Sequence, residues 1–205
     1  MKKTWLGNIL SDQELWLVVV FNLAIFVAYL QDATTASTIV VLYYLQSVFI
    51  GIQYFIRLIG LGRMGQAGSG KYGIAFFFLI HYGLFHVVYF VFLLTMMGQV
   101  PGKVEFDLMR WLLLALIGNT VLSTISDLKR DKQQPTLAGL VMFQPYLRVV
   151  PMHLLIIFGF TGDAARMDKA FLLFVGLKTL ADVLMHIIVN KTYRSHRPNA
   201  TGGWI

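Results

Sequence analysis

The sequence predicts an all-α integral membrane protein, a polytopic bundle of six transmembrane helices with both termini in the cytoplasm. Of its 205 residues, 57% are hydrophobic and only 13% are charged, too few to cover a soluble domain of this size with polar side chains. Six apolar runs, separated by short polar breaks, approach the length of about 20 residues that crosses a bilayer. Basic residues gather in the breaks on one side, which predicts the orientation.

The chain opens with two lysines and a short apolar stretch that we interpret as part of the mature protein, because no small-residue cleavage site follows it. Trp5, Leu6 and Ile9 share one face at helical spacing, which is typical of a segment lying along the membrane surface. Ser11 and Glu14 fit a capping box, which predicts the start of the first spanning helix.

Each of the six apolar runs predicts one spanning helix. At about 1.5 Å per residue they are long enough, or nearly so, to cross about 30 Å of hydrocarbon. The breaks are too short to hold a second domain, and we see no repeat of fixed period. We therefore expect residues 1–205 to form a single transmembrane domain. The predicted spans are residues 15–30, 39–59, 74–97, 108–125, 137–160 and 170–189.

The distribution of basic residues predicts cytoplasmic termini and a bacterial cytoplasmic (inner) membrane location. Only Lys103, Arg110, Arg166 and Lys169 fall on the far side. By the positive-inside rule, the side with more Lys and Arg is the cytoplasmic one. Eleven basic residues fall on the side of the termini: Lys2, Lys3, Arg57, Arg63, Lys71, Lys129, Arg130, Lys132, Lys191, Arg194 and Arg197.

Several function classes are excluded by the composition. The chain has no cysteine, which excludes disulfides, thiolate metal ligands and thiol catalysis. The net charge of +7 comes mainly from basic residues on one predicted side of the membrane, where they set the orientation of the chain. We therefore expect no nucleic-acid partner. The glycine-rich residues 60–71 partly match nucleotide-binding motifs. Such motifs follow a β-strand, whereas these residues follow a predicted membrane helix, so we interpret them as a flexible loop. The expected partners are the lipid bilayer, a lipid or small-molecule ligand, and further copies of the chain.

Ionisable residues inside the predicted spans are the strongest functional signal, because each costs roughly 2.5–3.5 kcal/mol at the centre of a membrane helix. In the third span, His81 and His86 are five residues apart and so lie on different faces, whereas Tyr82, His86 and Tyr89 share one face. In the fifth span, Pro145 and Pro151 free backbone carbonyls that a nearby arginine is well placed to bind.

The fifth and sixth spans complete this polar set. Arg148 and His153 lie in the fifth span, beside its two prolines. Lys178, Asp182 and His186 follow one another at four-residue spacing in the sixth, which predicts a polar stripe facing the bundle interior. Counted from the cytoplasmic ends, His81 and Asp182 both come out at a depth of about 12 Å.

Together these residues predict an intramembrane site. Neutral imidazoles with one carboxylate suit zinc, and haem iron or copper would also accept them. A zinc-bound water, with Asp182 and Lys178 as catalytic groups, would make the protein a lipid-directed hydrolase. A proton relay or proton-coupled transporter, and a non-catalytic assembly subunit, remain alternatives. The expected metal ligands are His81, His86, His153, His186 and Asp182, and the expected cofactor-binding side chains are Tyr82 and Arg148.

Three motifs resemble an uncharacterised bacterial family of small integral membrane proteins that carries a domain-of-unknown-function label. They are His81-Tyr82-Gly83-x-Phe85 in the third span, Arg148-x-x-Pro151-x-His153 in the fifth, and Leu177-Lys178-Thr179-x-x-Asp182-x-x-x-His186 in the sixth. The resemblance implies a shared polar core, and where the family has a second third-span histidine this chain has Tyr89. A fainter likeness, to membrane zinc amidases of the alkaline ceramidase and adiponectin-receptor type, implies zinc held by histidines near Asp182 and Ser47.

Overall fold

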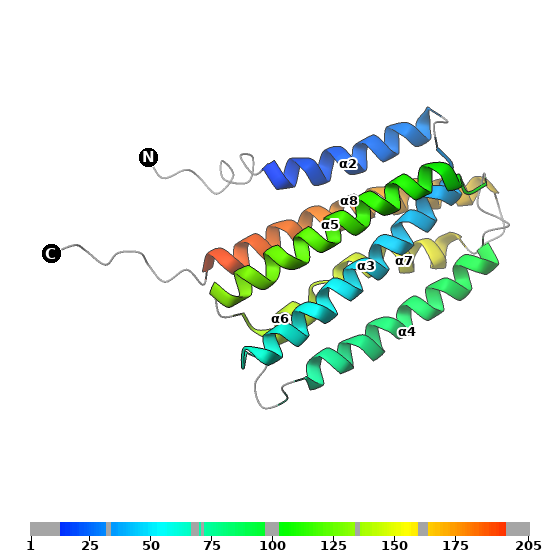
Figure 1. Cartoon of the computed structure of the whole chain (residues 1–205). Helices are drawn as coiled ribbons and strands as arrows, with labels where there is room; N and C mark the ends of the chain where they lie inside the picture. The colour runs from blue at the N-terminus through cyan, green and yellow to red at the C-terminus, as the bar shows by residue number, and fades with distance from the viewer. Residues whose placement is uncertain are drawn as a thin grey trace.

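The computed structural model of the chain is all-α, as the sequence predicts (Figure 1). It describes residues 13–31, 34–66, 70, 72–96, 103–133, 136–159 and 164–195. The surface segment predicted at Trp5 and the helix cap predicted at Ser11 lie outside these residues. The described helices are α2 (Gln13–Leu30), α3 (Ala36–Arg63), α4 (Gly73–Met96), α5 (Phe106–Gln133), α6 (Ala138–Phe143), α7 (Tyr146–Gly159) and α8 (Ala164–Ser195).

Among the described residues, three helices are long and apolar enough to cross a membrane: α3, α4 and α5. They correspond to the second, third and fourth predicted spans. A multi-pass membrane protein is therefore plausible on length and composition, and the other three spans stay predictions.

The apolar run 137–160 forms two helices rather than one. Helix α6 ends at Phe143, Gln144 and Pro145 form a turn, and α7 begins at Tyr146. Proline has no N–H to donate to the carbonyl four residues earlier, and its ring crowds that carbonyl, so the break falls where the sequence places Pro145. Pro151 lies inside α7 without ending it. Gln144 is buried at this break, and its side chain accepts a hydrogen bond from the Tyr54 hydroxyl at 3.1 Å.

Helix α5 extends further than the sequence predicts. The polar stretch between the predicted spans 108–125 and 137–160 is helical as far as Gln133. Its acidic side chains pack against α3 instead of lying in a loop, and Asp131 is fully buried. The end of α5 therefore contributes a polar contact to the helix bundle.

Helix α3 packs against α4, α5 and α6, while α8 packs against α7 and α2. The common core includes Tyr43, Tyr54, Phe78, Tyr82 and Phe174. In Figure 1, α2 begins and α8 ends at the same end of the bundle, where α3 and α5 also end. A chain with both termini on one side of a membrane requires this arrangement, and the assignment of that side to the cytoplasm stays a prediction.

A glycine brings α3 and α4 into close contact. A Cβ atom added to Gly51 would lie 2.5 Å from Cε1 of Tyr82, closer than any real side chain tolerates. The missing side chain therefore lets the Tyr82 ring lie directly against α3. This position brings the Tyr82 hydroxyl to Ser47, one helical turn before Gly51.

Candidate functional site

One face of α4 carries three buried polar side chains, as the helical spacing predicts. Tyr82, His86 and Tyr89 are 4%, 7% and 3% exposed. His81 is exposed, and its Nδ1 lies 2.8 Å from the hydroxyl of Tyr146 in α7. The prediction that His81 and His86 occupy different faces is confirmed.

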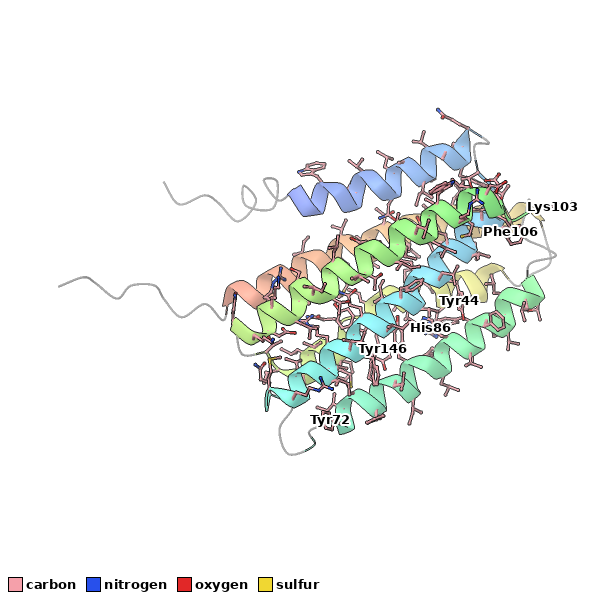
Figure 2. All side chains as sticks on the ribbon, in the orientation of Figure 1. Tyr44, Tyr72, His86, Lys103, Phe106 and Tyr146 are labelled. Atoms are coloured by element: carbon pink, nitrogen blue, oxygen red, sulfur yellow. The ribbon has the colours of Figure 1, made fainter. Side chains whose placement is uncertain are left out.

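His86 is held at the interface of α3 and α4 by directed hydrogen bonds. Its Nδ1 donates to the backbone carbonyl of Tyr82 at 2.9 Å, because a carbonyl oxygen can only accept. In a neutral imidazole, Nε2 then carries the lone pair and accepts from the Ser47 hydroxyl at 3.0 Å. The Tyr82 hydroxyl lies 3.1 Å from Ser47 Oγ and donates to the Ser47 carbonyl at 3.1 Å. Tyr44, labelled near His86 in Figure 2, donates to the His86 carbonyl at 3.3 Å.

A second contact joins α4 to α7, through the hydroxyl of Tyr89 and the imidazole of His153. Phe85 packs edge-on against both His81 and His153, with ring centroids 5.1 and 5.3 Å apart. An aromatic ring therefore borders both imidazoles that the sequence analysis assigned to one metal ion.

The third polar contact joins α8 to α2 and α3. Lys178 and Asp182, one turn apart in α8, form an ion pair in which the residues are 7% and 5% exposed. Asn22 of α2 donates to Asp182 Oδ2 at 3.4 Å and accepts from the Tyr43 hydroxyl at 3.2 Å. The Lys178 ammonium also lies 4.6 Å from the centroid of the Tyr43 ring. This cluster, defined as Asn22, Tyr43, Lys178 and Asp182, is called the ion-pair cluster below.

The predicted zinc ligands do not come together in the part of the chain that the structure describes. There, no three His, Cys, Asp or Glu side chains lie close enough to hold a metal ion. His81, His153 and Asp182 each contact a different partner. The side chains of His186 and Arg148 lie outside the described residues, so their predicted roles stay predictions, as does zinc.

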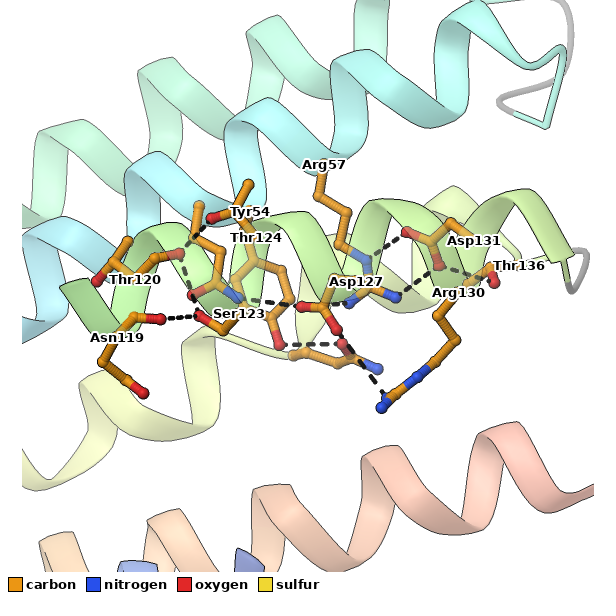
Figure 3. A network of polar contacts seen from close by, with 12 residues as sticks. Tyr54, Arg57, Asn119, Thr120, Ser123, Thr124, Asp127, Arg130, Asp131 and Thr136 are labelled. Atoms are coloured by element: carbon orange, nitrogen blue, oxygen red, sulfur yellow. Dashed lines mark hydrogen bonds and ion pairs between the residues drawn. The ribbon is translucent and has the colours of Figure 1, made fainter. Parts of the chain in front are cut away.

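One buried ion pair was not predicted from the sequence. Arg57 was predicted only as a cytoplasmic basic residue, but its side chain is 1% exposed. Its Nε donates to Asp131 Oδ2 at 2.6 Å and its Nη2 to Asp131 Oδ1 at 2.8 Å, a two-pronged pair between α3 and α5 (Figure 3). Asp182 is therefore not the only buried carboxylate of the bundle.

Polar neighbours surround this pair, and Figure 3 shows them along the facing sides of α3 and α5. Thr136 donates to Asp131 Oδ1 at 3.1 Å. Asp127 lies 3.8 Å from Arg57 Nη1 and accepts from Gln53 at 3.0 Å. The sequence does carry a signal for this contact, because Thr120, Thr124, Asp127 and Asp131 follow one another at spacings of four, three and four residues, on one helical face.

Comparison with known proteins gives a family. A family model described as Family of unknown function (DUF6498) matches residues 5–199. The chain belongs to this family. No curated protein and no solved structure matches it. The sequence motifs predicted membership of a family of unknown function, and the match over most of the chain confirms that prediction.

Membership of DUF6498 assigns no activity, so the chemistry of this chain must be argued from its polar contacts. The ion-pair cluster contains a carboxylate and an ammonium that can exchange a proton. The Ser47, Tyr82 and His86 contacts contain groups that both donate and accept hydrogen bonds. The first arrangement suits proton binding, and the second suits proton transfer or activation of a hydroxyl.

Proposed function

We propose that the protein is a multi-pass membrane protein that carries protons through its polar core. The observation that carries this proposal is the Lys178–Asp182 ion pair, buried between α8, α2 and α3. Charged side chains inside membrane helices are costly and are retained mostly where they bind or move ions or protons. Asp182, one of the five predicted metal ligands, is thereby given a different role, as a proton acceptor.

The neighbours of the pair support a change of protonation. A proton arriving at the Asp182 carboxylate would neutralise it and release the Lys178 ammonium from its partner. Asn22 would keep its hydrogen bond to the neutral carboxyl group, and Tyr43 would keep its hydrogen bond to Asn22. Because Tyr43 also offers its ring to the ammonium, the lysine keeps a favourable contact when its carboxylate partner is lost.

The remaining polar contacts offer routes for the proton towards either end of the bundle. Hydroxyl and imidazole groups can each accept a proton on one side and release one on the other. The Ser47, Tyr82 and His86 set forms such a chain, with separations of 3.0 and 3.1 Å. The Tyr89–His153 contact forms a second one. We expect water to connect these segments to the ion-pair cluster.

Proton flux into liposomes tests the proposal. Purified protein is reconstituted into liposomes that contain a pH-sensitive dye. The external pH is then changed at a fixed membrane potential, and the dye reports the rate at which protons enter. We expect wild-type flux that falls at least about tenfold in Asp182→Asn. The matched control is Asp107→Asn, which removes an exposed carboxylate that pairs with Arg110 at 3.4 Å in α5. Equal flux in the wild type, in Asp182→Asn and in empty liposomes would contradict the proposal.

A second candidate function, acyl transfer from a lipid, is favoured by one specific contact. Ser47 Oγ lies 3.0 Å from His86 Nε2, and His86 Nδ1 is held by a backbone carbonyl. A hydroxyl nucleophile, a base and an orienting group stand in this relation in serine hydrolases. Ser47 would attack an acyl carbonyl while His86 takes its proton and returns it to the leaving group. A fluorophosphonate probe should label Ser47 in the wild type and not in His86→Ala; an unlabelled wild type would contradict this candidate.

A further inference from the structure

Helix α5 is the least covered of the three candidate spans. Only 11% of its apolar window is buried, against 39% for α3 and 22% for α4. Its main packing partner is α3. The opposite side of α5 faces outward with large exposed side chains such as Trp111 and Leu122, which are 65% and 70% exposed. Apolar exposure alone is ordinary for a membrane helix, because lipid covers it.

One polar residue on this side is not ordinary. Asn119 is exposed and lies near the middle of the apolar run 108–125. Thr120, Ser123 and Thr124 in the same region donate to backbone carbonyls of their own helix at 2.8, 2.8 and 2.6 Å. Asn119 contributes only its backbone carbonyl, which accepts from Ser123 (Figure 3). Its carboxamide hydrogen-bonds to nothing in the described part of the chain, and such a group facing hydrocarbon is costly.

Asn119 lies within a regular seam of outward-facing residues. The seam residues follow one another at alternating spacings of four and three, the repeat by which two helices supercoil around each other. Five of them are exposed and Leu112 is half-buried. Small residues in the seam allow close approach of a partner helix in a membrane. The seam consists of Leu108, Leu112, Ala115, Asn119, Leu122 and Ser126.

We infer that this seam binds the same seam of a second copy of the chain. Every copy inserts with the same orientation, so two α5 helices meet in parallel around a two-fold axis along the membrane normal. That axis places Asn119 against Asn119. A carboxamide is self-complementary, since its NH₂ donates and its oxygen accepts, so each side chain satisfies the other. A single asparagine in a heptad seam also sets the register and the number of helices.

The charges near the seam permit this contact. The seam ends at Ser126, before the basic residues at the end of α5. Arg130 of that group lies 4.0 Å from Asp127 in its own helix, which offsets part of its charge. These groups lie at the predicted cytoplasmic surface, where water and salt screen repulsion between two copies.

Cysteine cross-linking in native membranes tests the inference, and the absence of cysteine from the chain makes each introduced thiol unique. A disulfide needs Cα atoms within about 7 Å, which the parallel seam provides. We expect Ala115→Cys and Leu122→Cys to form disulfide-linked dimers under mild oxidation. The matched controls, Leu114→Cys and Val121→Cys, lie one residue earlier and about 100° around the helix, and should remain monomeric. Equal cross-linking at all four positions, or at none, would overturn the inference.

A second measurement tests the asparagine itself. Asn119→Leu keeps the side-chain size and faces lipid, so the fold should persist. Energy transfer between labelled copies at increasing lipid dilution gives the dimer dissociation constant, which we expect to rise about fivefold, the equivalent of an interhelical hydrogen bond of about 1 kcal/mol. Val121→Leu on the neighbouring face should leave it unchanged. An unchanged dissociation constant in Asn119→Leu would contradict the inference. A wild-type protein that is monomeric at every dilution would also contradict it, and is the result expected if a different membrane protein binds this seam.

Discussion

Replacing Arg57 by methionine should destabilise the bundle more than any other single change at the α3–α5 interface. The arginine and Asp131 are 1% and 0% exposed, and two charge-assisted hydrogen bonds of 2.6 and 2.8 Å join them. Methionine has a similar length without charge or donors. The substitution therefore takes both charge-assisted hydrogen bonds from the buried Asp131 carboxylate, while the Thr136 hydroxyl still donates to it.

The size of the effect follows from this geometry. Removing one partner of a buried, hydrogen-bonded ion pair costs about 3–5 kcal/mol, because the other charge is left uncompensated. Asp131→Asn should cost less, about 2–3 kcal/mol, since Arg57 keeps a second carboxylate: Asp127 lies 3.8 Å from its Nη1. The double variant Arg57→Met/Asp131→Asn removes both charges together. It should cost less than the sum of the two single changes, with a coupling energy of at least about 2 kcal/mol.

Reversible unfolding in mixed detergent micelles, followed by circular dichroism, measures these free energies. The four proteins of the cycle are compared under one set of conditions. Asp107→Asn serves as the control, because it breaks an ion pair of the same helix in which the side chains are 63% and 97% exposed; such surface pairs contribute about 0–1 kcal/mol. The reasoning would be refuted if Arg57→Met cost no more than this control, or if the two single effects simply added.

Three further changes test other contacts. Gly51→Ala places a Cβ atom 2.5 Å from the Tyr82 ring and should cost about 1–3 kcal/mol in the same unfolding measurement, whereas Gly176→Ala, with open space around it, should not destabilise the bundle; equal effects would show that α3 and α4 are not in close contact. Tyr54→Phe removes the hydrogen bond to Gln144 at the break between α6 and α7 and should cost about 1 kcal/mol; no loss would mean that water replaces it. Metal analysis of the purified protein tests the predicted zinc site: because His81, His153 and Asp182 have separate partners, we expect that these three do not hold one zinc ion together; one zinc per chain that is lost in both His153→Ala and Asp182→Asn would contradict this expectation.

The periodicity of apolar residues predicted most of the helices, because a membrane helix must carry a long apolar run. It also identified the buried face of α4, since Tyr82, His86 and Tyr89 recur at helical spacing. It did not predict the length of α5, whose last turns are polar. Those turns remain helical because Asp131 finds a partner in another helix, and such a tertiary contact leaves only a weak trace in local sequence.

The composition of the candidate site was predicted better than its geometry. Residue types at membrane depth identified Lys178, Asp182, His86 and His153 as polar groups of the core, and the structure places each of them in a hydrogen-bonded contact. Depth counting assigned His81 and Asp182 to one layer. It could not show which helices are neighbours, and α8 packs against α2 and α7, so Asp182 meets Asn22 rather than an imidazole.

The central claim is that Asp182 exchanges a proton while it is buried in the bundle. Infrared difference spectroscopy of the protein in lipid, recorded during a pH titration, observes this event directly through the C=O stretch of a protonated carboxyl group. We predict a carboxyl band in a low-polarity environment that appears as the pH falls, is absent in Asp182→Asn, and persists in Asp107→Asn. A band unchanged by Asp182→Asn, or no buried carboxyl band at any pH at which the protein remains folded, would contradict the account and leave the Lys178–Asp182 pair as a purely structural contact.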